Sequence, residues 1–268
     1  MRWKARHSTF PTGCLRAKTD EVSSSIGLAP HDAPPSGENM DVMGMAEVTA
    51  ALREHVTVEL VAGAACRRLS TLAEGVGEFS EPLQRQAVTA VVRWRQVQAH
   101  LQEASVQTMG CCALQSLTKA LSSAGRQAAA EAGAIEATLN AIRDASASAG
   151  LGAGPAGAVG LAALTSLCYG YDAAMLRAIE GGALRAAVAA MRAHPQDEGL
   201  QLTGAQVLID FGKGEANKHR VTEAGGRVVV SAAMEAFPKM KRRGEHLLGV
   251  LPLGLPTRRE RGQNPGRV

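Results

Sequence analysis

Two short blocks of sequence recur along this chain, and they constrain its fold more than any other feature. The first block pairs two large apolar residues, beginning with Leu69 and Leu72, and it returns at intervals of 45, 50 and 44 residues. A small residue precedes each pair by four positions. Positions i, i+4 and i+7 share one face of an α-helix, so each block predicts a helix with a buried stripe. The later pairs are Leu114 with Leu117, Leu164 with Leu167, and Leu208 with Phe211, and the small residues are Ala65, Gly110, Gly160 and Gly204.

The second block contains a glycine that follows a short helix-forming segment. It reads EAGAIEATLNAI at 131–142, EGGALRAAVAAM at 180–191 and EAGGRVVVSAAM at 223–234. Gly133, Gly182 and Gly225 stand where a helix end requires a left-handed residue without a Cβ atom. One unit is therefore predicted as a short helix, a glycine turn, a second helix, a loop and a long third helix that carries the apolar stripe.

The composition favours an all-α fold. Hydrophobic residues make up 46% of the 268 residues but aromatic residues only 3%, as expected for closely packed helices with small side chains. The five cysteines include no CxxC pair, so we expect neither a disulfide framework nor a zinc site, and a reducing, cytoplasmic location. The positive charge lies at the ends: residues 1–19 carry +5 and residues 239–268 carry +6, whereas residues 20–238 carry −7.

A period of 44 to 50 residues with three helices per unit resembles the armadillo and HEAT class of helical repeats. The resemblance implies a right-handed α-solenoid of about three full units with partial ends, over residues 43–238. The first unit lacks its opening helix, residues 81–96 have lost the second block, and the pattern ends after residue 238. Residues 1–42 are predicted to be a disordered, basic and Ser/Pro-rich tail, and residues 239–268 a basic tail.

In armadillo proteins the third helix of each unit lines a concave groove, and import receptors of this family grip a peptide with Trp and Asn ladders. The resemblance places the Trp positions at Arg67, Cys112, Ala162 and Gln206, and the Asn positions at Thr71, Ser116, Ser166 and Asp210. Neither residue type occurs there, so reception of nuclear signals is not expected. The candidate peptide-binding groove is Arg67, Thr71, Cys112, Gln115, Ser116, Thr165, Ser166, Gln206 and Asp210.

Several motifs resemble cofactor, metal or catalytic sites, but each is explained more simply by the predicted helical structure. GAGPAG at 152–157 matches G-x-G-x-x-G but is predicted to be a linker between helices, without the strand that a dinucleotide site needs. His55, His100 and His194 recur at one repeat position, where units about 10 Å apart keep them from sharing a metal. Cys111 and Cys112 have no neighbouring base in the sequence. No catalytic motif is present, so we expect no enzyme, cofactor or metal.

The function expected from these features is a non-catalytic scaffold that binds an extended peptide or a partner helix. The alternative is a structural subunit that docks, or oligomerises, through open solenoid ends with uncovered apolar surface. Nucleic acid is an unlikely partner because the body is acidic. The uncharged stretch 145–171 is read as a buried helix after a loop, not a membrane span. Two alternatives to a cytoplasmic location remain. The basic stretch Lys239–Arg243 indicates the nucleus, and the first residues of the chain, which include no acidic residue, indicate an organelle.

Overall fold

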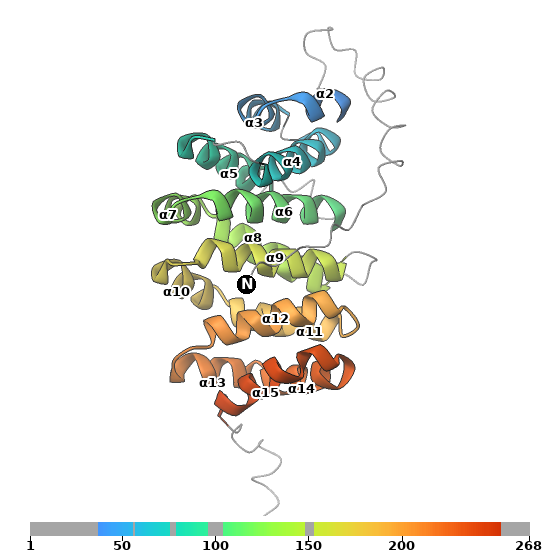
Figure 1. The fold of residues 1–268 in the computed structure, drawn as a ribbon, viewed down its shortest axis with the longest axis vertical. Coiled ribbons are helices and arrows are strands. Elements are labelled where there is room, and N and C mark those ends of the chain that lie inside the picture. The colour runs from blue at the N-terminus through green and yellow to red at the C-terminus, as the bar shows by residue number, and fades with distance from the viewer. Residues whose placement is uncertain (1–36, 56, 76–78, 96–103, 148–152, 253–268) are drawn as a thin grey trace, which may run out of the picture.

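The computed structural model describes residues 37–55, 57–75, 79–95, 104–147 and 153–252 (Figure 1). All regular elements in these ranges are helical, with fourteen α-helices, one short 3-10 helix and no strand. The prediction of an all-α fold is confirmed. Within the same ranges, no helix is both long enough and apolar enough to cross a membrane.

The N-terminal helices stack along the long axis of the molecule (Figure 1). Helix α3 packs on α4 and α5, and α5 in turn packs on α6. Helix α5 occupies the segment where the second block is missing from the sequence, and it is one continuous helix without a glycine turn. The helices are α2 Gly37–Val42, α3 Met45–Glu54, α4 Glu59–Glu74, α5 Glu81–Arg95 and α6 Ala104–Ala120.

The remaining helices follow in three groups of three. Each group has a short first helix, a second helix and a third helix. The first group is α7 Ser123–Glu131, α8 Ala134–Ala147 and α9 Ala153–Cys168. The second is α10 Asp172–Glu180, α11 Ala183–Ala193 and α12 Glu198–Phe211. The third is α13 Glu215–Glu223, α14 Gly226–Ala236 and, after the 3-10 turn Pro238–Met240, α15 Lys241–Val250.

Five helices form one row through the molecule, which we call the third-helix row: α4, α6, α9, α12 and α15. Each packs against the next in this order. Helix α8 packs behind α9 and α11 behind α12, while α7, α10 and α13 line one edge (Figure 1). The row is built from the segments that carry the apolar stripe, so their buried residues face neighbouring helices.

The three predicted glycine turns are present. Gly133, Gly182 and Gly225 adopt φ values of 92°, 91° and 88°, in the left-handed region that a side chain disfavours. Each lies between the first and second helix of its group. The sharp reversal folds the second helix back on the first, as the sequence pattern predicts.

Glycines in the third-helix row allow each third helix to approach the second helix of its own group. A Cβ at Gly160 would lie 2.8 Å from Cγ1 of Ile142, and one at Gly204 would lie 2.6 Å from Cγ of Met191. Gly244 makes the equivalent approach to Met234. Ile142, Met191 and Met234 close the three recurring twelve-residue blocks, so the same small-to-large contact recurs in all three groups.

The groups are also linked by side chains that reach the next group. Arg143 of α8 donates to the carbonyl of Gly181, in the turn after α10, and Arg192 of α11 donates at 3.5 Å to the carbonyl of Ala224, after α13. Within the second group, buried Gln201 of α12 donates to the carbonyls of Met191 and His194 at the end of α11.

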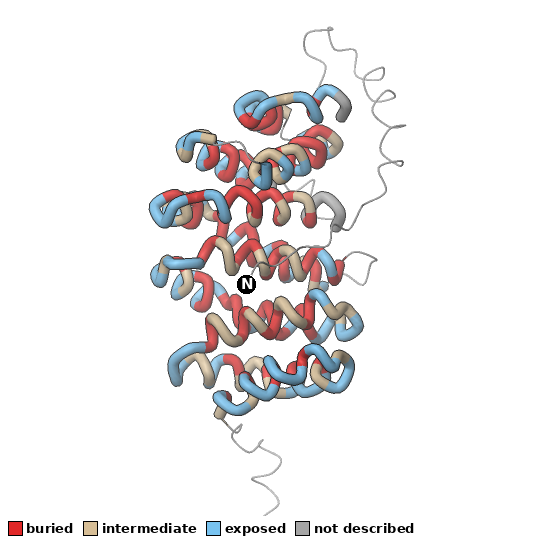
Figure 2. The backbone as a smooth tube through the Cα atoms, in the orientation of Figure 1, coloured by how far each residue is buried: buried red, intermediate tan, exposed pale blue. Residues whose placement is uncertain are grey.

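The buried apolar residues form two clusters that meet at α9, and they follow the interior of the stack (Figure 2). Leu161 and Leu164 of this helix belong to the C-terminal cluster, whereas Ala163 and Leu167 belong to the N-terminal one. Helix α9 is therefore buried on two sides, which explains why its sequence contains no charged residue.

The predicted C-terminal boundary is wrong. Residues 239–251 are not part of a solvated tail, because α15 packs on α12 and α14 and buries Met240, Leu247 and Leu251. Gly244, Leu248 and Leu251 repeat the spacing of a small residue followed by large residues at i+4 and i+7. This signal is present in the sequence, but it directly follows the charges of Lys241, Arg242 and Arg243.

Two other predicted loops are helical. The predicted N-terminal tail of residues 1–42 includes α2, which packs on α4 and buries Met40. The predicted linker GAGPAG includes the first turn of α9, because that helix begins at Ala153. Its glycines make room for the next group: a Cβ at Gly157 would lie 2.7 Å from Cδ1 of Leu200. Residues 1–36 and 253–268, the rest of the predicted tails, lie outside the described residues.

Candidate functional site

The nine predicted groove residues all lie on the first four helices of the third-helix row. Helix α9 shows which part of a helix in this row stays accessible. Helices α6 and α12 cover its two sides, and α8 covers its back. Only a narrow strip that includes Ala162, Thr165 and Ser166 stays partly accessible. The third-helix face is defined here as the accessible strips of α4, α6, α9 and α12. It includes Arg67, Thr71, Cys112, Gln115, Thr165, Ser166, Gln206 and Asp210.

Ser116 is the exception among the predicted residues. Its side chain is buried at 3% exposure, its hydroxyl lies 2.9 Å from that of Ser70, and it donates to Oε1 of Glu74 at 2.8 Å. These contacts tie α6 to α4. The prediction of Ser116 as a groove residue is therefore wrong, because the neighbouring helix covers the position.

Several polar groups of the third-helix face are satisfied within their own helix. The hydroxyls of Thr165 and Ser166 each donate at 3.0 Å to the carbonyl four residues earlier. Nε2 of Gln206 donates to Oδ2 of Asp210 at 2.9 Å, and Lys213 lies 3.8 Å from the other oxygen. On α9 the face therefore presents short, uncharged side chains whose hydroxyl groups already donate to backbone carbonyls of the same helix.

Arg67 of α4 and Gln115 of α6 differ from these residues. Among the described residues, neither side chain forms a hydrogen bond or an ion pair, although both backbone carbonyls accept bonds from threonines of the same helix. Arg67 is exposed and Gln115 is partly exposed. The two side chains lie on adjacent helices, so their free donors are available to a ligand that crosses α4 and α6.

Cys112 also lies on this face, but its thiol is poorly suited to nucleophilic chemistry. Burial, the neighbouring Cys111 and the carboxylate of Glu74 raise the pKa of Cys112 to about 11. Burial alone raises the pKa of Cys168 to about 12. At neutral pH both groups are thiols, whereas the nucleophile is the thiolate.

The histidines lie at helix ends. His55 follows α3 and His194 follows α11, and Nε2 of His194 lies 2.8 Å from the carbonyl oxygen of Ala145, near the end of α8. His100 lies outside the described residues. In the described part of the chain, no group of three or more His, Cys, Asp or Glu side chains could hold a metal ion.

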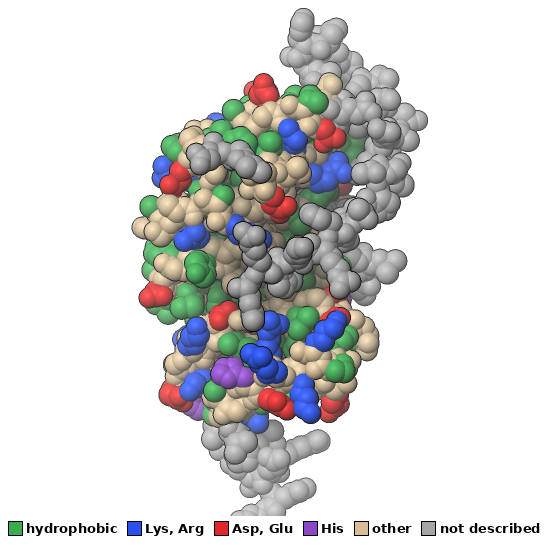
Figure 3. Space-filling view, in the orientation of Figure 1, with side chains coloured by type: hydrophobic (Ala, Val, Ile, Leu, Met, Phe, Trp, Pro, Cys, Tyr) green, Lys and Arg blue, Asp and Glu red, His purple; other side chains and the backbone are tan. Residues whose placement is uncertain are grey.

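The basic stretch Lys239–Arg243 is folded. Met240 is fully buried, Lys241 to Arg243 form the first turn of α15, and Lys239 pairs with Glu198 at 3.1 Å. Figure 3 shows basic side chains gathered over this end of the molecule. A localisation signal that is read as an extended peptide would require this turn to unfold.

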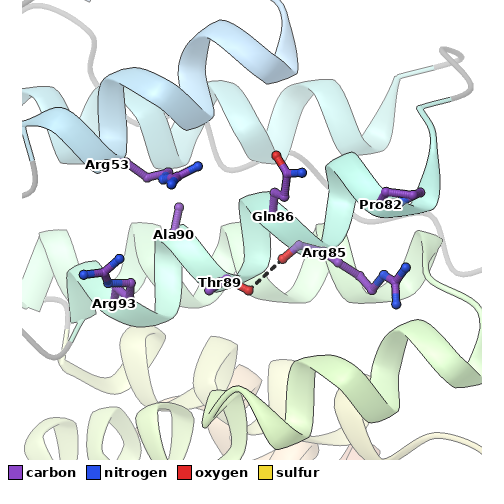
Figure 4. Close-up of a pocket in the computed structure, with 7 residues that line it drawn as sticks. All are labelled: Arg53, Pro82, Arg85, Gln86, Thr89, Ala90 and Arg93. Carbon is purple, nitrogen blue, oxygen red and sulfur yellow. Dashed lines mark hydrogen bonds between the residues drawn. The ribbon is translucent and has the colours of Figure 1, made fainter.

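A cleft between α3 and α5 is a feature that the sequence did not predict. It has a volume of about 470 Å³ and carries three arginines, Arg53, Arg85 and Arg93 (Figure 4). Pro82, Gln86, Thr89 and Ala90 complete its lining. Arg85, Thr89 and Arg93 recur every four residues on the exposed side of α5, and this spacing was visible in the sequence.

Comparisons with known proteins establish similarity at the level of the fold. No family model and no curated protein matches the chain. Two crystal structures of engineered proteins from the Northeast Structural Genomics Consortium are similar, each at 16% sequence identity. One has a TM-score of 0.60, with 88% of this chain and 99% of that chain covered. The other has a TM-score of 0.57, with 80% and 85% covered. The helical arrangement of this chain is therefore shared with solved proteins.

Proposed function

We propose that this chain is an armadillo-like α-solenoid that binds an extended peptide segment of a partner protein along its third-helix face, without catalysing a reaction. The observation that carries the proposal is the position of Arg67 and Gln115, whose donors lack partners among the described residues, on adjacent helices of a continuous row. The right-handed sense of the solenoid belongs to the same proposal.

The repeat interpretation is supported by contacts that recur between groups. Gly160 and Gly204 approach the last residue of the preceding twelve-residue block in the same way. Arg143 and Arg192, at corresponding positions, each reach the turn of the next group. Repeated contacts of this kind are expected when each unit buries its apolar face against its neighbours.

The chemistry of the face favours an extended peptide. An extended chain has unpaired backbone N–H and C=O groups, and the amide of Gln115 can both donate to and accept from them. Neighbouring helices lie about 10 Å apart, so an extended chain would cross about three residues per helix. The short side chains of Ala162, Thr165 and Ser166 leave room for a backbone to approach α9.

The alternative, docking through apolar open ends, receives less support. Helix α3 exposes Glu47, Arg53 and Glu54 at one end of the described chain. At the other end, α15 exposes Lys241, Arg242 and Glu245. Charged surfaces at both ends are the usual caps of a helical stack.

The proposal is tested by selecting binders from a phage library of random twelve-residue peptides. The affinity of a selected, fluorescein-labelled peptide is then measured by anisotropy for the native protein, Arg67→Ala and Gln115→Ala. We expect each substitution to weaken binding by about fivefold to fiftyfold, because each removes a hydrogen-bonding side chain from the complex.

The matched controls are Arg185→Ala on α11 and Gln127→Ala on α7, which are exposed outside the third-helix face. Both controls are expected to bind the peptide as the native protein does. Failure to enrich any peptide, or equal affinity for the Arg67 and Gln115 variants, would contradict the proposal.

A further inference from the structure

The cleft between α3 and α5, called the α3–α5 cleft from here on, is a second surface that the proposed function does not use. Arg53 reaches from α3 over α5, Arg93 lies at one end of the cleft, and Arg85 lies further along α5 toward Pro82 at the other end (Figure 4). Two residues separated by eight positions in an α-helix are about 12 Å apart along its axis. The three guanidinium groups therefore line an elongated site and do not converge on one point.

None of these arginines is neutralised by the described residues. Arg53, Arg85 and Arg93 form no ion pair there, and Thr89 uses its hydroxyl to donate to the backbone carbonyl of Arg85 at 2.9 Å. Glu81 at the start of α5 accepts from the hydroxyl of Ser122 at 2.6 Å. Three cations thus stand together on a body, residues 20–238, that carries a net charge of −7.

Packing does not explain the arginines either. Helix α5 is held by its other side, where Ala87, Val88, Val91 and Val92 are buried. Arg85 and Arg93 are exposed, so shorter or neutral side chains would leave this apolar contact intact. Clustered like charges are unfavourable for the free protein, and a ligand of opposite charge removes that repulsion.

We propose that the α3–α5 cleft binds an acidic segment of a partner protein, with carboxylates of that segment paired to Arg85, Arg93 and Arg53. Each guanidinium presents two parallel N–H groups that match a carboxylate. The elongated spacing suits carboxylates distributed along a chain better than a compact anion. A single-stranded nucleic acid fits less well, because the described lining residues include no aromatic side chain on which a base could stack.

The test uses a fluorescein-labelled octaglutamate peptide, with octaglutamine and an octathymidylate of DNA as comparisons, at 50 mM and 300 mM NaCl. The native protein should bind octaglutamate at low salt, more weakly at high salt, and octaglutamine not at all. Arg85→Glu with Arg93→Glu should lower the affinity for octaglutamate by about tenfold or more, since two attractive pairs become repulsive.

Arg185→Glu with Arg220→Glu changes the net charge by the same amount outside both the cleft and the third-helix face, and should lower that affinity less than twofold. An equal loss in this control would show general charge attraction and overturn the proposal, as would absence of octaglutamate binding at 50 mM NaCl. The proposal would also be overturned if the protein bound octathymidylate more tightly than octaglutamate and if this binding depended on Arg85 and Arg93. That result would identify a nucleic-acid phosphate backbone as the ligand. Peptides selected on the third-helix face should bind the Arg85/Arg93 variant normally, so the two proposals fail independently.

Discussion

At the scale of single residues, glycine and its partner set the distance between helices. A methyl group at Gly160 would lie 2.8 Å from Cγ1 of Ile142, a buried side chain whose β-branch cannot turn away easily. We predict that Gly160→Ala lowers the free energy of unfolding by about 1 kcal/mol, because overpacking outweighs the gain in helix propensity. Urea denaturation followed by circular dichroism measures the change.

The matched control is Gly249→Ala in α15, where a Cβ would have no atom within 4 Å. The same substitution should there raise stability by about 0.5 to 1 kcal/mol, through helix propensity alone. Ile142→Ala combined with Gly160→Ala should cost less than the sum of the two single changes, since the new methyl group enters the space left by isoleucine. Additive costs would contradict the contact.

The thiol of Cys112 leads to a prediction about pH. Its pKa of about 11 keeps it protonated at neutral pH, so the reactive thiolate is about one molecule in a thousand at pH 8. Alkylation of Cys112 by iodoacetamide, followed by peptide mass spectrometry, should accelerate about tenfold per pH unit between pH 8 and 10 without reaching a plateau. The rate for the same cysteine in urea should level off near pH 10, and a rate that levels off in the same range in the folded protein would disprove the raised pKa.

The sequence predicted correctly those residues of the candidate site whose accessibility depends only on their position around their own helix. Thr165, Ser166 and Gln206 lie opposite the apolar stripe of their own helix, and the structure leaves them partly accessible. Ser116 was assigned to the same phase, but α4 covers it. Helical periodicity orients a side chain relative to its own helix and does not place the neighbours.

At the scale of elements, α15 provides the clearest prediction. Leu247 is 1% exposed between α14 and α12, whereas Val250 in the same helix is 43% exposed. Leu247→Ala should lower the free energy of unfolding by about 2 to 4 kcal/mol, because it leaves a cavity in the core. The control Val250→Ala should change it by less than about 1 kcal/mol. Thermal and urea denaturation would show no difference between the two variants if residues 239–251 were a solvated tail.

The sequence patterns identify an element when they extend over several turns. Helices α4, α6, α9 and α12 are 14 to 17 residues long and carry the apolar stripe, and all were predicted. Helices α2 and α15 have only 6 and 10 residues, and α15 begins with three basic side chains. Their few apolar residues become a recognisable buried face only when α4, α12 and α14 are in place.

At the scale of the whole molecule, the two described ends determine how the chain associates with itself. Helices α3 and α15 expose charged side chains, including Glu47 and Glu54 on the first and Arg242 and Glu245 on the second. Removing these charges from water would be unfavourable, so we predict a monomer of 27.9 kDa. Size-exclusion chromatography with light scattering measures this mass. A stable dimer at micromolar concentration would favour docking through the ends.

The amino-acid sequence by itself determined the helical class, the left-handed glycine turns and the helices that carry the apolar stripe. These features depend on interactions between residues close in sequence: a backbone that needs φ > 0, and side chains that share a helical face. Three features were decided only by the tertiary structure: the burial of Ser116, the folding of Lys241 to Arg243 into a terminal helix, and the placement of Arg53, Arg85 and Arg93 along one cleft. Each depends on which helix lies beside another, and this arrangement is set by packing between residues far apart in the chain.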